Sequence, residues 1–144
     1  MERRGLSPVY LLMKKAYLMR ELLLIFVKHP VPGKAKPRLA ASIGHDKAIE
    51  VYKELLQYTL KISQQISADK VVFFGNEMPE SDLWSQAGYA RYQQVGETLG
   101  DRMESAFKWG FTQGYDHIGI IGSDNARLTP SILEEGFSLL NNHD

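Results

Sequence analysis

The 144-residue sequence contains no cysteine, which excludes disulfide bonds, thiolate metal sites and cysteine nucleophiles. It also has no excess charge of either sign, since 17 basic and 17 acidic residues give a formal net charge of zero. That balance argues against a protein that binds nucleic acid by bulk charge. No apolar run reaches the roughly 20 residues of a membrane span. We therefore expect a cytoplasmic protein with no nucleic-acid partner and no stable membrane insertion.

The composition is that of a folded domain, with 44% hydrophobic and 24% charged residues. The length fits one domain with a single hydrophobic core. Residues 1–20 read as an N-terminal extension, and residues 21–144 as the domain itself. Three interpretations of the extension compete: a flexible or helical tail, a weak membrane-surface helix, and an upstream start codon with Met19 as the working one.

Short apolar segments alternate with amphipathic ones along residues 21–144. Asp46 and Thr129 are placed as helix N-caps, and Pro130 as a first helical residue. Strands joined by helices predict β-α-β units with right-handed crossovers, and hence a three-layer α/β/α fold with a mostly parallel sheet. Strands are expected at Leu22–Val27, Lys70–Gly75, Arg91–Val95 and Ile118–Ile121, a short helix from Ser81, and longer helices at Asp46–Ile66, at Leu99–Gln113 and from Pro130 onward.

A cationic segment, "KHPVPGKAKPRLA", follows the first strand. In parallel α/β sheets ligands bind beyond the carboxyl ends of the strands, where phosphates are held by backbone N–H groups and by Lys or Arg. Prolines stiffen such a segment and fix the arrangement of its cations. The alternative is a solvated basic loop. The candidate phosphate-binding residues are Lys28, Gly33, Lys34, Lys36 and Arg38.

Two further segments follow later strands and reach the same edge of the sheet. Asp124, in the sequence "GSD", is placed to hold a divalent cation that bridges a diphosphate, although Asp in such a turn is also a common turn former or helix cap. Gly96 and Gly100 flank a turn before the next helix, and Arg102 lies in its first turn. By itself this second segment indicates an ordinary helix start with a solvated arginine.

Together the three segments resemble a bacterial family related to the glycosyltransferase-A and nucleotidyltransferase fold, often labelled selenodomain-associated transferases. The resemblance runs from about Glu21 to the C-terminus. The family pattern F-x-K-x-P-x-P-G-K-x-K-T-R-L-A is matched by Phe26, Lys28, Pro30, Pro32, Gly33, Lys34, Lys36, Arg38, Leu39 and Ala40. Its pattern Q-x-G-x-D-L-G-x-R-M is matched by Gln94, Gly96, Leu99, Gly100, Arg102 and Met103, and I-G-[ST]-D-x-P by Ile121, Gly122, Ser123 and Asp124.

The resemblance implies a nucleotide or nucleotide-sugar as partner, and Mg²⁺ or Mn²⁺ held by Asp124 as the cofactor. It implies substrate binding by the cationic segment and by Gly96, Gly100 and Arg102, and it assigns no catalytic residue. The sequence departs from the pattern at three places. Pro37 stands for Thr, Thr98 for Asp, and Asn125-Ala126 for a pair that ends in Pro.

The activity implied by the resemblance is metal-dependent glycosyl transfer. Nucleotidyl transfer on the same fold and a catalytically silent nucleotide-binding or oligomerising module are the alternatives. The family's fold implies the strand order 3-2-1-4, and its members continue beyond the part matched here. We therefore expect the N-terminal half of a glycosyltransferase-A fold, incomplete at its C-terminus. An open edge at the strand Ile118–Ile121 would favour a homodimer, unless the last helix or the N-terminal extension covers it.

Overall fold

The computed structural model describes residues 19–31, 40–41 and 43–143. The expected strands and helices are present, with bounds that agree to within two residues. The N-terminal extension lies outside the described residues, apart from Met19 and Arg20. The elements follow in the order β1 (Glu21–Val27), α3 (His45–Gln64), β2 (Asp69–Phe74), α4 (Leu83–Gln86), β3 (Ala90–Gln93), α5 (Leu99–Thr112), β4 (His117–Gly122) and α6 (Pro130–His143).

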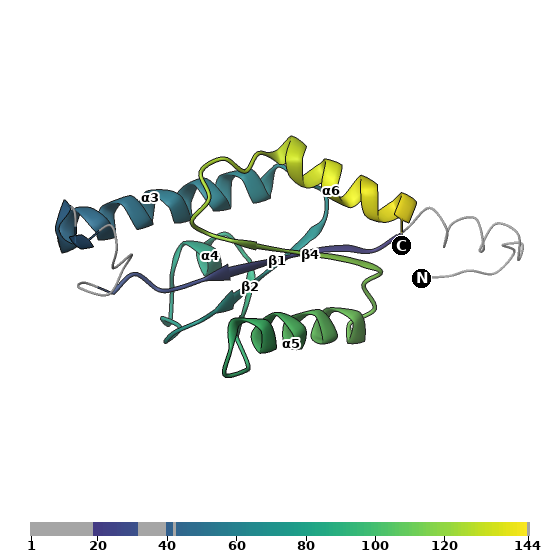
Figure 1. Ribbon diagram of the computed structural model, residues 1–144, viewed down its shortest axis with the longest axis horizontal. Coiled ribbons are helices and arrows are strands. Elements are labelled where there is room, and N and C mark those ends of the chain that lie inside the picture. Colours follow the sequence, from purple (N-terminus) through teal and green to yellow (C-terminus); the bar gives the residue numbers. More distant parts are fainter. Residues whose placement is uncertain (1–18, 32–39, 42, 144) are drawn as a thin grey trace, which may run out of the picture.

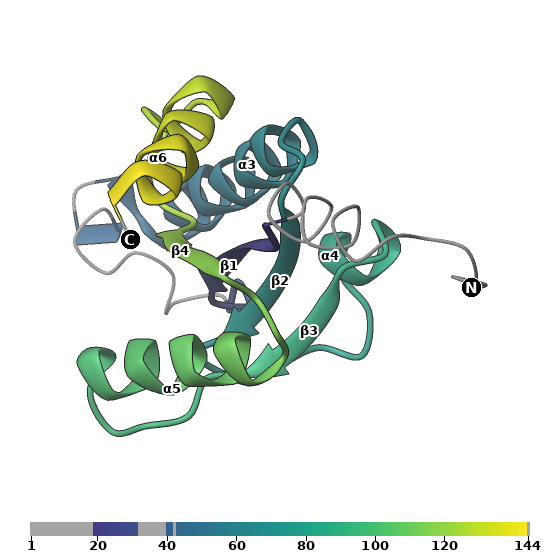
Figure 2. The same ribbon diagram turned by 90° about the vertical axis from the view of Figure 1, so that its right-hand side faces the viewer.

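The four strands form one parallel sheet in the order β3-β2-β1-β4, which confirms the expected order 3-2-1-4. Strand β1 lies in the middle, and its Ile25 is paired with Val72 of β2 on one side and with Ile121 of β4 on the other. Helices α3 and α6 cover one face of the sheet and α5 covers the other (Figure 2). The fold is therefore the predicted three-layer α/β/α arrangement.

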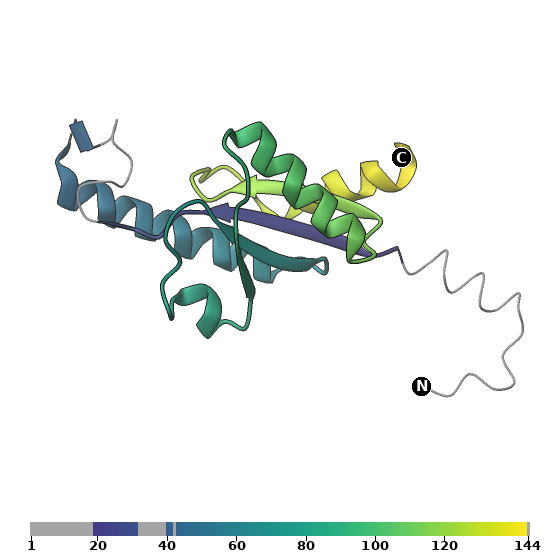
Figure 3. The ribbon, with the colours of Figure 1, turned by 90° about the horizontal axis from the view of Figure 1, so that it is seen from below.

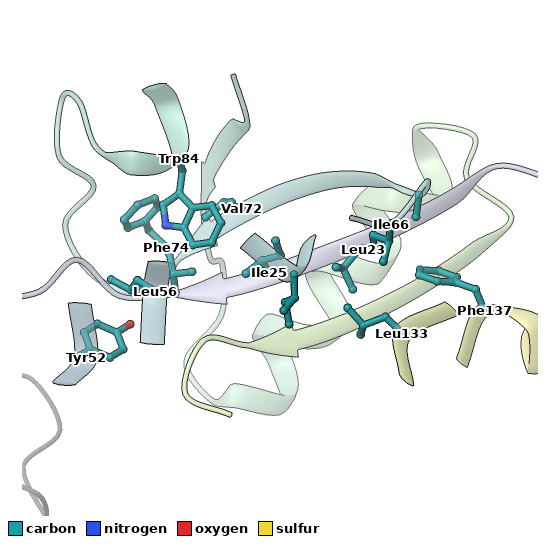
Figure 4. Close-up of a cluster of buried hydrophobic side chains, with 13 residues drawn as sticks. Leu23, Ile25, Tyr52, Leu56, Ile66, Val72, Phe74, Trp84, Leu133 and Phe137 are labelled. Carbon is teal, nitrogen blue, oxygen red and sulfur yellow. The ribbon is translucent and has the colours of Figure 1, made fainter. Parts of the chain in front are cut away.

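Strand β1 explains why the sheet needs both helical layers. All six residues from Leu22 to Val27 are buried, and successive side chains of a strand point to opposite faces. Leu23, Ile25 and Val27 therefore join the larger core under α3, α4 and α6, which Figure 4 shows. The residues between them pack under α5, in a smaller core of Leu22, Leu24, Phe26, Val71, Phe73, Ala106 and Ile118.

The helix starts test the expected caps. Thr129 is confirmed, because its Oγ1 accepts from the backbone N–H of Ile132 at 3.2 Å. The expected cap of α3 is wrong: the N-cap is Gly44, without a side-chain hydrogen bond, and Asp46 lies in the first turn. There its negative charge still interacts favourably with the positive end of the helix dipole.

Helix α3 reaches further than the strands that it covers. Its first turns extend beyond the carboxyl end of β1, as Figure 1 and Figure 3 show. Side chains from the middle of α3 can therefore meet the segments that follow the strands. Across the residues that the structure describes, no helix combines the length and the apolar character that crossing a membrane requires.

Candidate functional site

The carboxyl edge of the sheet gathers the segments that follow all four strands, because the strands are parallel. Lys28 follows β1, Gly75 follows β2, Gln94 follows β3 and Ser123 follows β4. The expectation that the cationic segment and the turn at Asp124 begin at one edge is therefore confirmed for the described residues. Gly33, Lys34, Lys36, Pro37 and Arg38 lie outside the described residues.

Tyr52 of α3 connects the segments after β1 and β4. Its hydroxyl accepts from the backbone N–H of Lys28 at 2.9 Å and lies 3.0 Å from the carbonyl of the same residue. The Oγ of Ser123 lies 3.1 Å away on the other side. Tyr58, one and a half turns further along α3, donates to the carbonyl of Leu128. Helix α3 thus holds the segment after β4 at two places.

The segment after β1 is also fixed to the segment after β2. The backbone N–H of His29 donates to Oδ1 of Asn76 at 2.7 Å, and Nδ2 of Asn76 donates back to the carbonyl of His29 at 3.0 Å. The backbone N–H of Gly75 donates to the carbonyl of Val27 at 2.8 Å. These bonds satisfy the backbone groups left over where the strand ladder stops.

Gln93, the last residue of β3, and Gln94, which follows it, form hydrogen bonds at the other side of the edge. Nε2 of Gln94 donates to the carbonyl of Phe73 at 3.0 Å. Gln93 donates to the carbonyls of Phe74 and Asn76, at 3.0 and 2.6 Å. The edge from β3 to β4 is thus held by side-chain amides and one tyrosine hydroxyl, which are neutral at physiological pH.

Gly96 and Arg102 are in contact at the turn before α5. Nε of Arg102 donates to the carbonyl of Gly96 at 2.9 Å in an exposed hydrogen bond, so this arginine is bonded to the turn that precedes its own helix. Gly96 has φ of 138°, a region that side chains seldom adopt. Gly100 differs: its nearest neighbour is Oγ1 of Thr98, 3.8 Å from where a Cβ would stand.

Asp124 lies at the exposed turn after β4. One of its carboxylate oxygens, Oδ1, is 3.2 Å from where a Cβ on Gly122 would stand, so glycine leaves room for the carboxylate beside the strand end. Burial is the main factor that raises the pKa of Tyr52, hydrogen bonds to Ser123 and Lys28 lower it, and the charge of Asp124 raises it further. The carboxylate of Asp124 and the hydroxyl of Tyr52 therefore share one local environment.

The donor set near Asp124 bears on the expected cation. Within the described ranges, no three His, Asp or Glu side chains gather as they would in an all-protein metal site. Mg²⁺ is commonly bound by only one or two carboxylates, with water and substrate phosphates as the other ligands. A single aspartate at the ligand-facing edge fits that kind of site, and it does not fit a structural metal centre.

A pocket of about 260 Å³ opens beside Lys28, between the segment after β1, helix α3 and the start of α4. Its apolar lining includes Leu56, Phe74 and Trp84, and its polar lining includes Lys28, His29, Lys53, Gln57, Ser81 and Asp82. The carboxylate of Asp82 is occupied, because it caps α4 and lies 3.5 Å from Arg91. Among the cations of this lining, Lys53 lies 3.7 Å from the carboxylate of Glu50.

Comparisons with known proteins agree with the fold and the motifs. A profile of a bacterial family described as "Uncharacterized protein conserved in bacteria (DUF2064)" matches residues 58–144, and the chain belongs to this family. A crystal structure from Desulfovibrio desulfuricans G20, described as a "putative nucleotide-diphospho-sugar transferase", superposes with a TM-score of 0.73 at 29% sequence identity. The match covers 82% of this chain and 53% of that one, so this chain spans about half the length of the solved protein. The curated proteins contain no match.

The resemblance inferred from the motifs is confirmed: the chain has a glycosyltransferase-A-like fold in a family of unknown function. Sequence reasoning missed Tyr52 and Asn76. Tyr52 recurs with the apolar residues of α3 and reads as a core residue. The available signal was chemical, since a buried tyrosine hydroxyl normally has a hydrogen-bond partner.

Proposed function

We propose that the domain binds a nucleotide or nucleotide-sugar at the carboxyl edge of its sheet, in the cytoplasm, and that its parent activity is metal-dependent glycosyl transfer. The observation that carries this proposal is the structural similarity to a protein described as a nucleotide-diphospho-sugar transferase, at 29% identity over 82% of this chain. The cationic segment supports it, because that segment begins at Lys28, on the edge where parallel sheets bind ligands.

In this proposal the basic residues bind the phosphates of the ligand and one carboxylate binds the divalent cation. Lys28, Lys34, Lys36 and Arg38 would neutralise the phosphate oxygens of the ligand by charge-assisted hydrogen bonds. Asp124 would hold Mg²⁺ or Mn²⁺, which when bound supplies positive charge to the diphosphate. Fixed charges that meet the charge developing on a leaving diphosphate are commonly the largest contribution to catalysis.

In the same proposal the pocket beside Lys28 binds a ring of the ligand, either the base or a sugar. Its lining combines apolar and aromatic side chains with the polar side chains of Lys28, His29 and Lys53. Ligand sites of this kind combine apolar walls with a few polar groups that fix orientation. The volume of about 260 Å³ suits one ring system rather than a whole nucleotide-sugar.

Two alternatives use the same fold. Nucleotidyl transfer would use the same cationic segment to hold a nucleoside triphosphate. A silent nucleotide-binding module is favoured by the three departures from the family pattern. Release of a nucleoside diphosphate from a nucleotide-sugar would separate glycosyl transfer from both, and release of pyrophosphate from a nucleoside triphosphate would indicate nucleotidyl transfer.

Self-association as a homodimer is a further part of the proposal. Among the described strands β4 pairs with β1 alone, and Ile132 and Leu139 of α6 are about half exposed. Strand edges with free backbone groups recruit other chains. Sedimentation across a micromolar concentration range would show a dimer, and a concentration-independent monomer would refute this part without affecting ligand binding.

A thermal-shift screen tests the main proposal. The chain would be melted with nucleoside diphosphates, triphosphates and nucleotide-sugars, each with Mn²⁺ and with a chelator. A ligand that binds only the folded state stabilises it by about 2.7 kcal/mol at 100 times its Kd, and we expect this shift to need Mn²⁺. Inorganic phosphate and free sugars serve as controls. If no nucleotide moves the melting temperature with either addition, the proposal is wrong.

A further inference from the structure

Tyr52 makes three polar contacts with its single hydroxyl. A phenol has one hydrogen to donate and two lone pairs to accept. All three contacts are satisfied together when Tyr52 donates to the carbonyl of Lys28, at 3.0 Å, and accepts from the N–H of Lys28, at 2.9 Å. The remaining lone pair then accepts the hydroxyl hydrogen of Ser123, at 3.1 Å. No donor or acceptor capacity of the tyrosine is left over.

The position of this hydroxyl is set by the core. The residue is only 7% exposed, and its ring belongs to the larger hydrophobic cluster. Figure 4 shows Tyr52 at one end of that cluster, with Phe137 at the other. Ser123 is 5% exposed. Because burial raises the pKa of Tyr52, the hydroxyl keeps its proton at neutral pH and remains able to donate.

The contacts join two segments that follow neighbouring strands of the sheet. Lys28 is the first residue of the cationic segment. Ser123 directly precedes Asp124, the candidate cation ligand. Strands β1 and β4 pair up to Phe26 and Gly122, and β1 continues for one more residue, Val27, which pairs with Phe74 of β2. Hydrogen bonds in a buried network strengthen one another and restrict the groups that they join.

We propose that Tyr52 is a positioning residue that couples the segment after β1 to the turn after β4. A ligand that orders one of these segments then favours the bound arrangement of the other. This statement about ligands rests on the proposed function: phosphate binding after β1 and cation binding at Asp124 would strengthen each other through Tyr52. Such coupling is reciprocal, so each ligand raises the affinity of the other by the same factor.

Amide hydrogen exchange, read residue by residue in NMR spectra of the whole chain, tests the coupling without any ligand. Tyr52→Phe keeps the ring and removes only the hydroxyl. We expect faster exchange at the amides of Lys28, Ser123 and Asp124 together. Ser123→Ala should speed exchange at Asp124 but leave Lys28 protected, because Tyr52 still accepts from its N–H.

Tyr89→Phe is the matched control. Tyr89 also packs against the larger core and has its hydroxyl 2.6 Å from a serine, Ser63, but this pair involves neither Lys28 nor Ser123. It should leave the exchange of both segments unchanged. The proposal is overturned if Tyr52→Phe affects only one of the two segments, affects neither, or acts no differently from Tyr89→Phe.

A second measurement connects the coupling to the proposed function. The Kd values of ADP, CDP, GDP and UDP would be measured with and without Mn²⁺ for the parent chain and both tyrosine variants. Coupling between two ligand sites typically amounts to 5–150-fold. We expect Tyr52→Phe to reduce the Mn²⁺ effect measurably, leaving the part that Mn²⁺ contributes directly at the diphosphate, while Tyr89→Phe preserves the whole effect. An unchanged Mn²⁺ effect in Tyr52→Phe overturns the inference about ligands. If no nucleotide binds the parent chain, the proposed function is wrong, and the exchange measurement alone decides the role of Tyr52.

Discussion

Gly96 offers the sharpest test of the turn that leads into α5. A Cβ added at Gly96 would lie 2.8 Å from Cβ of Asp101 and 2.9 Å from the backbone nitrogen of Arg102. Neither atom is the free end of a flexible side chain, so the turn or the start of α5 must shift. The substitution also forces a side chain into φ of 138°. Gly96→Ala therefore combines backbone strain with a steric clash.

Two other glycines separate these contributions. Gly88 has φ of 86° and open space around its Cβ position, so Gly88→Ala tests strain alone. A left-handed conformation costs about 1–2 kcal/mol, which the lower entropy of the unfolded chain offsets by about 0.4–1 kcal/mol. Gly100 has neither problem and lies inside α5, where Ala is better than Gly by up to about 1 kcal/mol.

The expected order of stability is therefore Gly100→Ala, then the parent, then Gly88→Ala, then Gly96→Ala. Overpacking adds about 1–3 kcal/mol, so Gly96→Ala should lose about 2–4 kcal/mol. With a urea m-value of about 2 kcal/mol/M, the midpoint falls by roughly 1–2 M. Urea unfolding followed by circular dichroism measures this. If Gly96→Ala proves as stable as Gly88→Ala, the close contact with α5 is wrong.

Three further predictions concern the site. Replacing Lys34 and Arg38 together with Ala should weaken nucleotide binding in a titration by about 1.5–3 kcal/mol for each lost contact, with an unchanged melting curve; unchanged affinity would contradict a phosphate-binding segment. Asp124→Asn should abolish the Mn²⁺ dependence of that binding, because a neutral amide is a poor ligand for a hard cation; persistent Mn²⁺ dependence would reassign Asp124 as a turn former. The pKa of Tyr52 is raised from 10.0, so its contribution to the free energy of unfolding is full below about pH 10 and is lost as pH rises toward the folded-state pKa. Tyr52→Phe should therefore show a smaller fall of the urea midpoint above about pH 10 than the parent chain. An equal fall in the two chains would refute a raised pKa of Tyr52 in the folded state.

The fold was predictable because its strongest signals are local. The unbroken apolar run Leu22–Val27 is what a strand buried on both faces requires, and the structure buries all six residues. The order of strands came from the family motifs, since periodicity does not determine which strands are neighbours. The incorrect cap of α3 has a similar origin: Asp46 and Gly44 are both plausible helix-start residues, and only the backbone geometry distinguishes them.

The site was less predictable than the fold, for a physical reason. Charged residues after strands are visible in a sequence, and Lys28 and Asp124 do lie at the expected edge. The residues that hold the edge together are neutral and come from elsewhere: Tyr52 is 24 residues from Lys28 and 71 from Ser123. Asn76 is 47 residues from its partner His29. No local spacing predicts such pairs, because the fold alone brings them together.

The departures from the family pattern bear on whether the chain is a silent module. Thr98 stands where the pattern has Asp, yet its Oγ1 accepts from the N–H of Asp101 at 3.1 Å and caps α5, as an Asp would. Asn125 occupies the pair that normally ends in Pro, and its Oδ1 accepts from the N–H of Arg127 at 2.9 Å, which forms a local turn without proline. In both replacements a side-chain oxygen accepts from a nearby backbone N–H. Loss of function would have to arise from ligand contacts rather than from a damaged turn, which makes phosphate and Mn²⁺ binding, and not stability, the measurements that decide between an enzyme domain and a silent one.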